Sequence, residues 1–204
     1  SYLVYRVGVH GVTATAFAAY GWVDQARAAI AAAEHVGVSP AVSAQVLASF
    51  QNVRRRMEVS GTVQVAGGQI TVYDDFAHHP TAVDETLRAL RGRHPEGALW
   101  AVFEARSATA CRGLHQEQYA RAFGAADRVI FAPLGRSDIP EPERLDLGRI
   151  VRDLEAAGRR AVAAASVDAI VASIAEGARP GDTVALLSNG AFGGIYDKLR
   201  EALA

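Results

Sequence analysis

The sequence predicts an α/β fold in which a small α+β unit precedes a doubly wound, mostly parallel sheet with helices on both faces. From about residue 57 onward, apolar runs of strand length alternate with segments whose apolar residues recur at helical spacing. Three runs, at 99–103, 129–132 and 184–187, are continuously apolar, as strands covered by helices on both faces must be. The sheet is therefore expected to be Rossmann-like.

The first fifty-odd residues are expected to form two strands and two helices. Alternating residues predict the strands, which turn at Gly8–Gly11, and an alanine-rich stretch that stops at Gly37 predicts the first helix. Ser39–Pro40 suits the N-cap and first turn of the second helix. These elements are expected at residues 2–7, 12–17, 22–36 and 40–50. They offer too little surface for a core, so we expect residues 1–56 to end another domain and residues 57–204 to form a domain of their own.

The second domain is expected to alternate strands with helices. Its first helix begins at Pro80, because proline cannot continue a strand ladder but fits the first turn of a helix. Val83, Leu87 and Leu90 then follow at helical spacing. The expected strands lie near residues 62–66, 69–74, 98–104, 127–132, 160–164 and 182–188. The expected helices lie near residues 80–91, 114–124, 146–157, 167–177 and 192–203.

Composition and charge are those of an ordinary globular chain. Half of the 204 residues are hydrophobic, 21% are charged and the net charge is −1, which gives no electrostatic reason to expect nucleic acid or an anionic membrane as a partner. No apolar run approaches a membrane span and no signal peptide is recognisable, so a cytoplasmic location is the default expectation. The single cysteine, Cys111, excludes an internal disulfide and a cysteine-rich zinc site, and we interpret it as structural or incidental.

Two carboxylates and two imidazoles lie within six residues, at Asp74, Asp75, His78 and His79, directly after an alternating run. Strand-to-helix loops of a parallel sheet gather at the carboxyl ends of its strands, where such sheets bind ligands and helix N-termini favour anions. A capped turn would explain a single Asp or His at this place. The combination of all four favours a functional site over a capped turn.

Three further loops are expected to reach the same edge. Glu104–Thr109 places a fixed cation, Arg106, beside hydroxyl groups, and arginine clamps phosphate or carboxylate groups with its planar fork. The loop after residue 132 offers Arg136, Ser137 and Asp138. The glycine-rich turn at 187–194 suits an anion because small residues let the backbone approach it, although the glycines can equally serve helix-to-strand packing.

The positions of arginine and lysine show which phosphate-binding groups the sequence offers. Arg56 lies close to the expected domain junction, from which it could reach a phosphate group held between domains, whereas we interpret Arg54 as a solvated charge. Residues 7–15 have the outline of a phosphate loop, but Val12 stands where that chemistry needs lysine. The only lysine, Lys198, belongs to the last expected helix. A lysine-containing phosphate loop is therefore absent from this sequence.

Three motifs together resemble a known family. They are Tyr-Asp-Asp-Phe-Ala-His-His-Pro-Thr-Ala at 73–82, Glu-Ala-Arg-Ser at 104–107 and Ser-Asn-Gly-Ala-Phe-Gly-Gly at 188–194. They resemble the C-terminal domain of the Mur ligases, and within that family the ligases of murein recycling. The likeness runs from about Ala28 to the end of the chain. Because Mur ligases have three domains, the resemblance implies that residues 1–56 are the tail of the central ATPase domain and residues 57–204 the C-terminal domain.

The resemblance implies an ATP-dependent amide ligase. Such enzymes use ATP and Mg²⁺ to convert the carboxylate of UDP-N-acetylmuramate into an acyl phosphate, which the amine of the incoming peptide attacks. The implied peptide is L-Ala-γ-D-Glu-meso-diaminopimelate. ATP and Mg²⁺ would be held mainly by the central domain, so we expect little ligation from this chain alone. The implied partners are the two substrates and the N-terminal and central domains, with no nucleic acid and no membrane.

The resemblance also implies roles for individual residues. The invariant arginine and the invariant acid of the family fall on Arg56 and Asp75, which with Arg106 form the implied catalytic set. The implied nucleotide contacts are Arg56, Asp74, Asp75, Phe76 and His78. The implied contacts to the incoming substrate are Arg106, Ser107, Ser188, Asn189 and Gly190. The resemblance implies no metal ligand in this chain.

Other hypotheses stay open. Another Mur ligase, such as UDP-N-acetylmuramate–L-alanine ligase, would carry the same motifs. A non-catalytic nucleotide- or peptide-binding module would explain why Trp22 and Gln25 stand where the family has a His-Asn-x-x-Asn pattern. A metal-dependent hydrolase could be built on Asp74, Asp75, His78 and His79, but adjacent residues of an extended segment point to opposite faces and do not readily converge on one ion.

Overall fold

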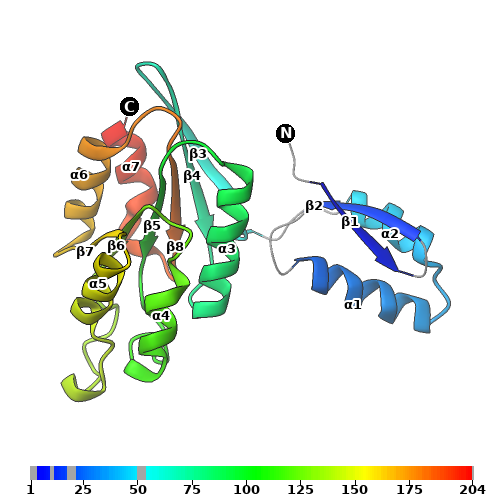
Figure 1. Ribbon diagram of the computed structural model, residues 1–204, viewed down its shortest axis with the longest axis horizontal. Coiled ribbons are helices and arrows are strands. Elements are labelled where there is room, and N and C mark those ends of the chain that lie inside the picture. Colours follow the sequence, from blue (N-terminus) through cyan, green and yellow to red (C-terminus); the bar gives the residue numbers. More distant parts are fainter. Residues whose placement is uncertain (1–3, 10–11, 18–21, 50–53, 204) are drawn as a thin grey trace.

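The computed structural model describes residues 4–9, 12–17, 22–49 and 54–203. Its N-terminal elements form a small unit, and the rest of the chain forms a larger α/β unit (Figure 1). The small unit consists of β1 (Val4–Val9), β2 (Val12–Phe17), α1 (Trp22–His35) and α2 (Pro40–Ala48). These are the two strands and two helices that the sequence predicts.

Local signals set the boundaries within the small unit. β1 and β2 pair in antiparallel register, while the middle of their predicted turn, His10 and Gly11, lies outside the described residues. Ser39 caps α2, because its side-chain oxygen accepts the backbone N–H of Val42 at 3.4 Å. Gly37 has a φ of 90° just after α1, as expected of a helix-terminating glycine. The helix α2 ends at Ala48, and its predicted end at Phe50 lies outside the described residues.

The larger unit is built on a six-stranded sheet in the order β3-β4-β8-β5-β6-β7. Its strands are β3 (Glu58–Val65), β4 (Gly68–Asp75), β5 (Leu99–Phe103), β6 (Arg128–Phe131), β7 (Arg160–Ala163) and β8 (Thr183–Leu187). All neighbouring strands run parallel except β3, which forms an antiparallel hairpin with β4. The predicted mostly parallel sheet is confirmed, and all six predicted strands are present.

Helices cover both faces of this sheet. They are α3 (Pro80–Arg93), α4 (Gln116–Ala122), α5 (Leu147–Ala156), α6 (Val167–Gly177) and α7 (Ile195–Leu203). One core cluster joins α3, α4 and α5 to the sheet through Leu87, Tyr119 and Leu154. The other cluster joins α6 and α7 to the opposite face through Ile174 and Leu199. The sheet is therefore doubly wound, as the continuously apolar strands predict.

The helices α4 and α7 begin later than the sequence predicts. A 3₁₀ turn, Gly113–His115, precedes α4, and another, Phe192–Gly194, precedes α7. Phe192, Gly193 and Gly194 all have positive φ, with Phe192 at 47° and fully buried. The glycine-rich segment is thus a left-handed turn that leads into α7 and not the first turn of the helix itself.

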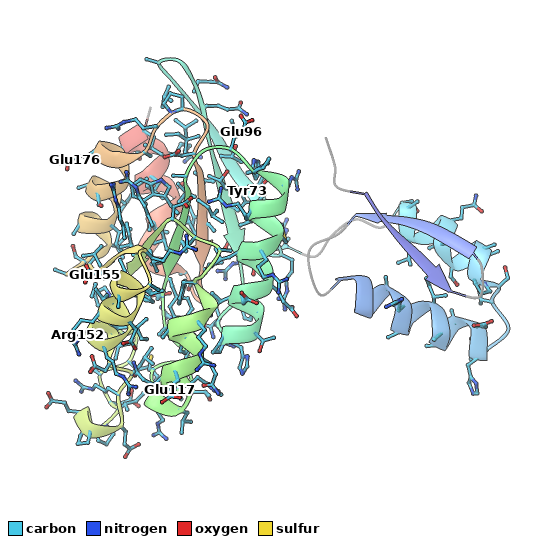
Figure 2. All side chains as sticks on the ribbon, in the orientation of Figure 1. Tyr73, Glu96, Glu117, Arg152, Glu155 and Glu176 are labelled. Carbon is cyan, nitrogen blue, oxygen red and sulfur yellow. The ribbon has the colours of Figure 1, made fainter. Side chains whose placement is uncertain are left out.

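Buried side chains fill the space between the sheet and its helices, whereas the five charged side chains labelled in Figure 2 (Glu96, Glu117, Arg152, Glu155 and Glu176) lie on the outer surface. Tyr73 of β4 belongs to the α3 side of the core, where its hydroxyl lies 2.9 Å from Nε2 of His94. Among the described residues, no helix combines the length and the apolar character that crossing a bilayer requires.

Candidate functional site

The carboxyl ends of the parallel strands are level with one another. Asp75 of β4 and Phe103 of β5 both pair with Leu187 of β8, and Phe103 also pairs with Phe131 of β6. The chain leaves β4 and β5 toward helices on one face and leaves β8 toward α7 on the other face. Such an edge contains a topological switch point, where open α/β sheets bind ligands. We call the loops at this edge the rim; they comprise residues 76–79, 104–107, 132–136 and 188–194.

Asp75 is a buried anchor at the end of β4. Its Oδ2 accepts the backbone N–H of Met57 and its Oδ1 accepts that of Ala77, both at 2.7 Å. Burial raises the pKa of the Asp75 carboxyl, while the two N–H groups and the nearby Arg56 guanidinium act in the opposite direction. Asp75 thereby fixes the segment before β3 against the turn after β4.

Asp74 contacts protein groups with both of its oxygens. Its Oδ2 accepts Nε of Arg55 at 3.0 Å, and its Oδ1 accepts the hydroxyl of Tyr196 at 2.6 Å. Burial, together with the Asp74 carboxylate, raises the pKa of the Tyr196 phenol, which keeps that hydroxyl a donor. A nucleotide contact at Asp74, implied by the family resemblance, would have to share an oxygen with one of these partners.

Phe76 lies beside two guanidinium groups. The Cζ atoms of Arg55 and Arg56 are 5.6 Å and 5.9 Å from the centroid of its ring, within the range of cation–π attraction. Arg56 is exposed at this place. An aromatic face and an exposed positive charge therefore occur together where the chain enters the larger unit, and this pair of groups suits the base and the phosphates of a nucleotide.

The two histidines of the rim have different surroundings. Nδ1 of His79 accepts the backbone N–H of Thr81 at 3.4 Å, so His79 is the N-cap of α3. His78 lies edge-on to Phe76, and its carbonyl accepts the hydroxyl of Tyr119. His79 therefore caps a helix, which is the alternative to a functional role that a single histidine at this place would have. In the described part of the chain, no group of three or more His, Cys, Asp or Glu could hold a metal ion.

Ser188 joins the loops that follow β4, β5 and β8. Its hydroxyl donates to Oε2 of the buried Glu104, and the backbone N–H of Gly190 donates to the same hydroxyl at 2.9 Å. Its backbone N–H donates to the carbonyl of Asp75 at 3.0 Å. The structure therefore brings Asp75, Glu104 and the 188–190 loop together at one edge.

Arg106 lies across the neighbouring loops with its side chain 49% exposed. A Cβ placed on Gly190 would lie 2.2 Å from its Cδ, and a Cβ on Gly135 would lie 3.0 Å from its Cγ. The absence of side chains at these two positions makes room for the arginine. Its Nη1 lies 3.8 Å from Oε1 of Glu104, which orients the guanidinium at the rim. An arginine held in this way can donate to a carboxylate or phosphate.

Three other predicted residues have mainly local contacts. Ser107 accepts the backbone N–H of Ala110 at 3.1 Å and stabilises a turn. Asn189 has a buried Oδ1 without a hydrogen-bond partner in the described part of the protein. Arg136 pairs with the exposed Asp138 two residues away. Ser107 and Arg136 thus stabilise their own loops, whereas the Asn189 oxygen is left without a partner.

The surroundings of Cys111 agree with a structural role for this residue. The residue is buried, and its thiol lies 2.9 Å from the carbonyl of Ala105. Burial also raises the pKa of the thiol, which disfavours a reactive thiolate.

Sequence reasoning missed three residues of the site. Arg55 lies inside a run of three arginines and had no signal that separated it from its neighbours. Glu104 belongs to the second motif, and a carboxylate directly after a fully apolar strand is the signal that could have marked it. Tyr196 is 122 positions from Asp74, so no local pattern connects the two.

Comparison with known proteins agrees with the motifs. The family model "Mur ligase, glutamate ligase domain" matches residues 55–190. The Escherichia coli K12 UDP-N-acetylmuramate–L-alanyl-γ-D-glutamyl-meso-2,6-diaminoheptandioate ligase is 44% identical over 177 residues, covering 86% of this chain and 36% of the relative. The UDP-N-acetylmuramate–L-alanine ligase of Halorhodospira halophila is 32% identical over 87% of this chain and 36% of its own length. The chain thus spans little more than a third of these curated relatives.

A solved structure of a murein peptide ligase also resembles this chain. The murein peptide ligase of Psychrobacter arcticus has a TM-score of 0.67 and 35% identity, over 89% of this chain and 36% of that one. The family model covers more than half of the chain and includes the rim up to Gly190. This chain therefore belongs to the Mur ligase family.

Proposed function

We propose that this chain forms the C-terminal part of an ATP-dependent amide ligase that joins L-alanyl-γ-D-glutamyl-meso-diaminopimelate to UDP-N-acetylmuramate. Relatives from Escherichia coli and Haemophilus influenzae whose names state these substrates are 44% and 40% identical to the chain. The observation that carries the proposal is the rim, where a half-exposed Arg106, the 188–190 loop and Asp75 meet at the switch point of the sheet.

We propose that residues 57–204 act as the C-terminal domain and residues 1–56 as the end of a central ATPase domain. The family match begins at residue 55, beside the Met57 backbone that Asp75 binds. In the described residues the two carboxylates at the end of β4 accept hydrogen bonds from protein donors, and no group of three or more His, Cys, Asp or Glu side chains could hold a metal ion. We therefore assign Mg²⁺ mainly to the rest of the ligase.

The residues of this chain would position charged groups. ATP supplies the phosphoryl group that activates the muramate carboxylate. Arg56, exposed beside the Phe76 ring, would offset negative charge on the phosphates. Arg106 would bind a carboxylate of the incoming peptide with its planar fork. The 188–190 loop, fixed by Glu104 and Asp75, would hold the peptide so that its amine approaches the activated carbonyl.

The test is the substrate preference of the full-length ligase. We expect ADP release that requires both UDP-N-acetylmuramate and the tripeptide, with a product whose mass, measured by mass spectrometry, exceeds that of UDP-N-acetylmuramate by the tripeptide less one water. L-alanine is the competing substrate, because a relative named for it is 32% identical. A product that contains only L-alanine would move the chain to that ligase, and no ADP release with either amine would overturn the proposal. The 204-residue chain alone is expected to show no measurable ligation.

A further inference from the structure

Arg55 connects four separate parts of the larger unit. Its Nε donates to Oδ2 of Asp74 at 3.0 Å, and its Nη2 donates to the carbonyl of Ser188 at 2.6 Å. The same Nη2 lies 3.4 Å from the hydroxyl of Tyr196, and the guanidinium carbon lies 5.6 Å from the Phe76 ring. These partners belong to β4, to the loop after β8, to α7 and to the turn after β4.

The backbone of Arg55 is held as firmly as its side chain. Its φ is 57°, in the left-handed region that side-chain-bearing residues rarely occupy, and Met57 has a φ of 47°. The N–H of Arg55 donates to Oε2 of Glu58 at 2.8 Å, and its carbonyl accepts the N–H of Phe76 at 2.8 Å. Such a conformation persists only where the surroundings over-determine it. The position of Arg56, between these two left-handed residues, depends on these contacts.

Ser188 receives a contact on each of its polar groups. Its N–H donates to Asp75, its hydroxyl donates to Glu104, and its carbonyl accepts Arg55. The hydrogen bond from Arg55 is the contact that joins this loop to the segment before β3, at a separation of 133 residues. Because the donor is a charged guanidinium, this hydrogen bond to the Ser188 carbonyl is stronger than one between neutral groups.

We propose that Arg55 is a positioning residue that couples the 54–57 segment to the 188–190 loop, so that Arg56 and the peptide-binding loop are set in place together. The inference rests on the proposed function, because that function gives the loop its substrate. An ordinary surface ion pair would not have this effect, since exposed pairs contribute little. The side chains of Arg55 and Asp74 are only 29% and 12% exposed, and the guanidinium reaches a backbone carbonyl as well as the carboxylate.

Amide hydrogen exchange of the 204-residue chain tests the coupling without any ligand. We expect Arg55→Met to speed exchange at the Ser188 and Gly190 amides by roughly tenfold relative to the amide of Val102 in β5, as loss of one charge-assisted hydrogen bond predicts. Arg54→Met, at an exposed neighbour, is the control with the same charge change and should leave that ratio unchanged.

Two milder variants keep the test decisive if Arg55→Met does not fold. Arg55→Lys retains the charge but cannot donate to Asp74 and Ser188 from two nitrogens of one planar group, so it should also speed exchange at Ser188. Tyr196→Phe removes a hydroxyl from Asp74 and from Nη2 of Arg55 but leaves the hydrogen bond between Arg55 and Ser188, so it should not. Equal ratios for Arg55→Lys and Tyr196→Phe would overturn the proposal, as would an effect of Arg55→Met that Arg54→Met reproduces.

Kinetics of the full-length ligase distinguish positioning from stability. We expect Arg55→Met to raise the KM for the tripeptide several-fold and to leave the KM for UDP-N-acetylmuramate unchanged. A purely structural role would lower kcat through a smaller folded fraction and leave both KM values unchanged, and that result would contradict the proposal. If the wild-type ligase does not use the tripeptide, the proposed function fails, whereas the exchange experiment still decides whether Arg55 couples the two segments.

Discussion

The carboxylate of Asp75 holds the backbone of Met57, since Oδ2 accepts its N–H at 2.7 Å across 18 positions of sequence. Met57 has a φ of 47°, and Arg55, two residues earlier, has a φ of 57°. An acid at the end of a strand therefore maintains an unfavourable backbone conformation next to Arg56.

Asp75→Asn should destabilise the chain by about 2–4 kcal/mol, because the asparagine amide can accept only one of the two backbone N–H groups and directs its own NH₂ toward the other. Urea denaturation followed by circular dichroism measures the change. Asp84→Asn, which alters an outward-facing pair with Arg88 at 3.7 Å, is the control and should cost little. A cost below about 0.5 kcal/mol for Asp75→Asn would mean that the carboxylate does not hold the segment.

The elements of the fold were largely predictable from sequence. Continuously apolar runs and the proline at position 80 mark β5, β6, β8 and the start of α3, because burial on two faces and the missing N–H of proline act locally. The start of α7 was predicted three residues early. The left-handed conformation of Phe192 depends on burial of its ring in the core, which no local pattern reveals.

The site was predictable in outline but not in its partners. The sequence placed Asp75, Arg106 and the 188–190 loop at one edge, because loops that follow parallel strands must share an edge. The family resemblance implies a nucleotide contact at Asp74, and that contact stays a prediction, while the structure adds that both of its oxygens have protein partners, Arg55 and Tyr196. Those partners come from distant elements, so only the folded arrangement identifies them.

Gly190→Ala should displace Arg106 with little effect on stability. The added methyl group would lie 2.2 Å from Cδ of Arg106, which is a flexible, half-exposed side chain and can move away. We therefore expect the KM of the full-length ligase for the tripeptide to rise roughly tenfold, as loss of a bidentate carboxylate contact predicts. Gly61→Ala, where an added Cβ meets nothing within 4 Å, is the matched control. An unchanged KM for Gly190→Ala would separate Arg106 from peptide binding.

Stability should fall in mild acid through His94. Burial lowers the pKa of His94, and the neighbouring Arg93 and Arg91 lower it further. The folded state then binds this proton less readily than the unfolded state, so the contribution to stability is complete above the ordinary histidine pKa of 6.5 and is lost as the pH falls through the lower pKa of the folded state. His94→Gln should reduce the loss of stability between neutral pH and mild acid, measured by urea denaturation at each pH. The exposed His35→Gln should not; equal slopes for the two variants would contradict the assignment.

Asp182→Ala should affect stability and leave substrate recognition intact. At the amino end of the sheet, this buried carboxylate accepts the backbone N–H of Ala98 at 2.8 Å, the indole N–H of Trp100 at 2.9 Å and the backbone N–H of Arg179 at 3.0 Å. Its removal leaves three donors without this acceptor and should cost about 3 kcal/mol. The tripeptide KM of the folded full-length variant should equal that of the wild type. A raised KM would show that the two ends of the sheet are not independent.

The most direct test of the account is the KM of the full-length ligase for the tripeptide in the variant Arg106→Met. If the rim binds the incoming peptide through this guanidinium, the KM for the tripeptide rises at least roughly tenfold while the KM for UDP-N-acetylmuramate stays the same. Unchanged KM values for both substrates in a folded Arg106→Met enzyme would contradict the account, because the peptide would then bind away from the rim.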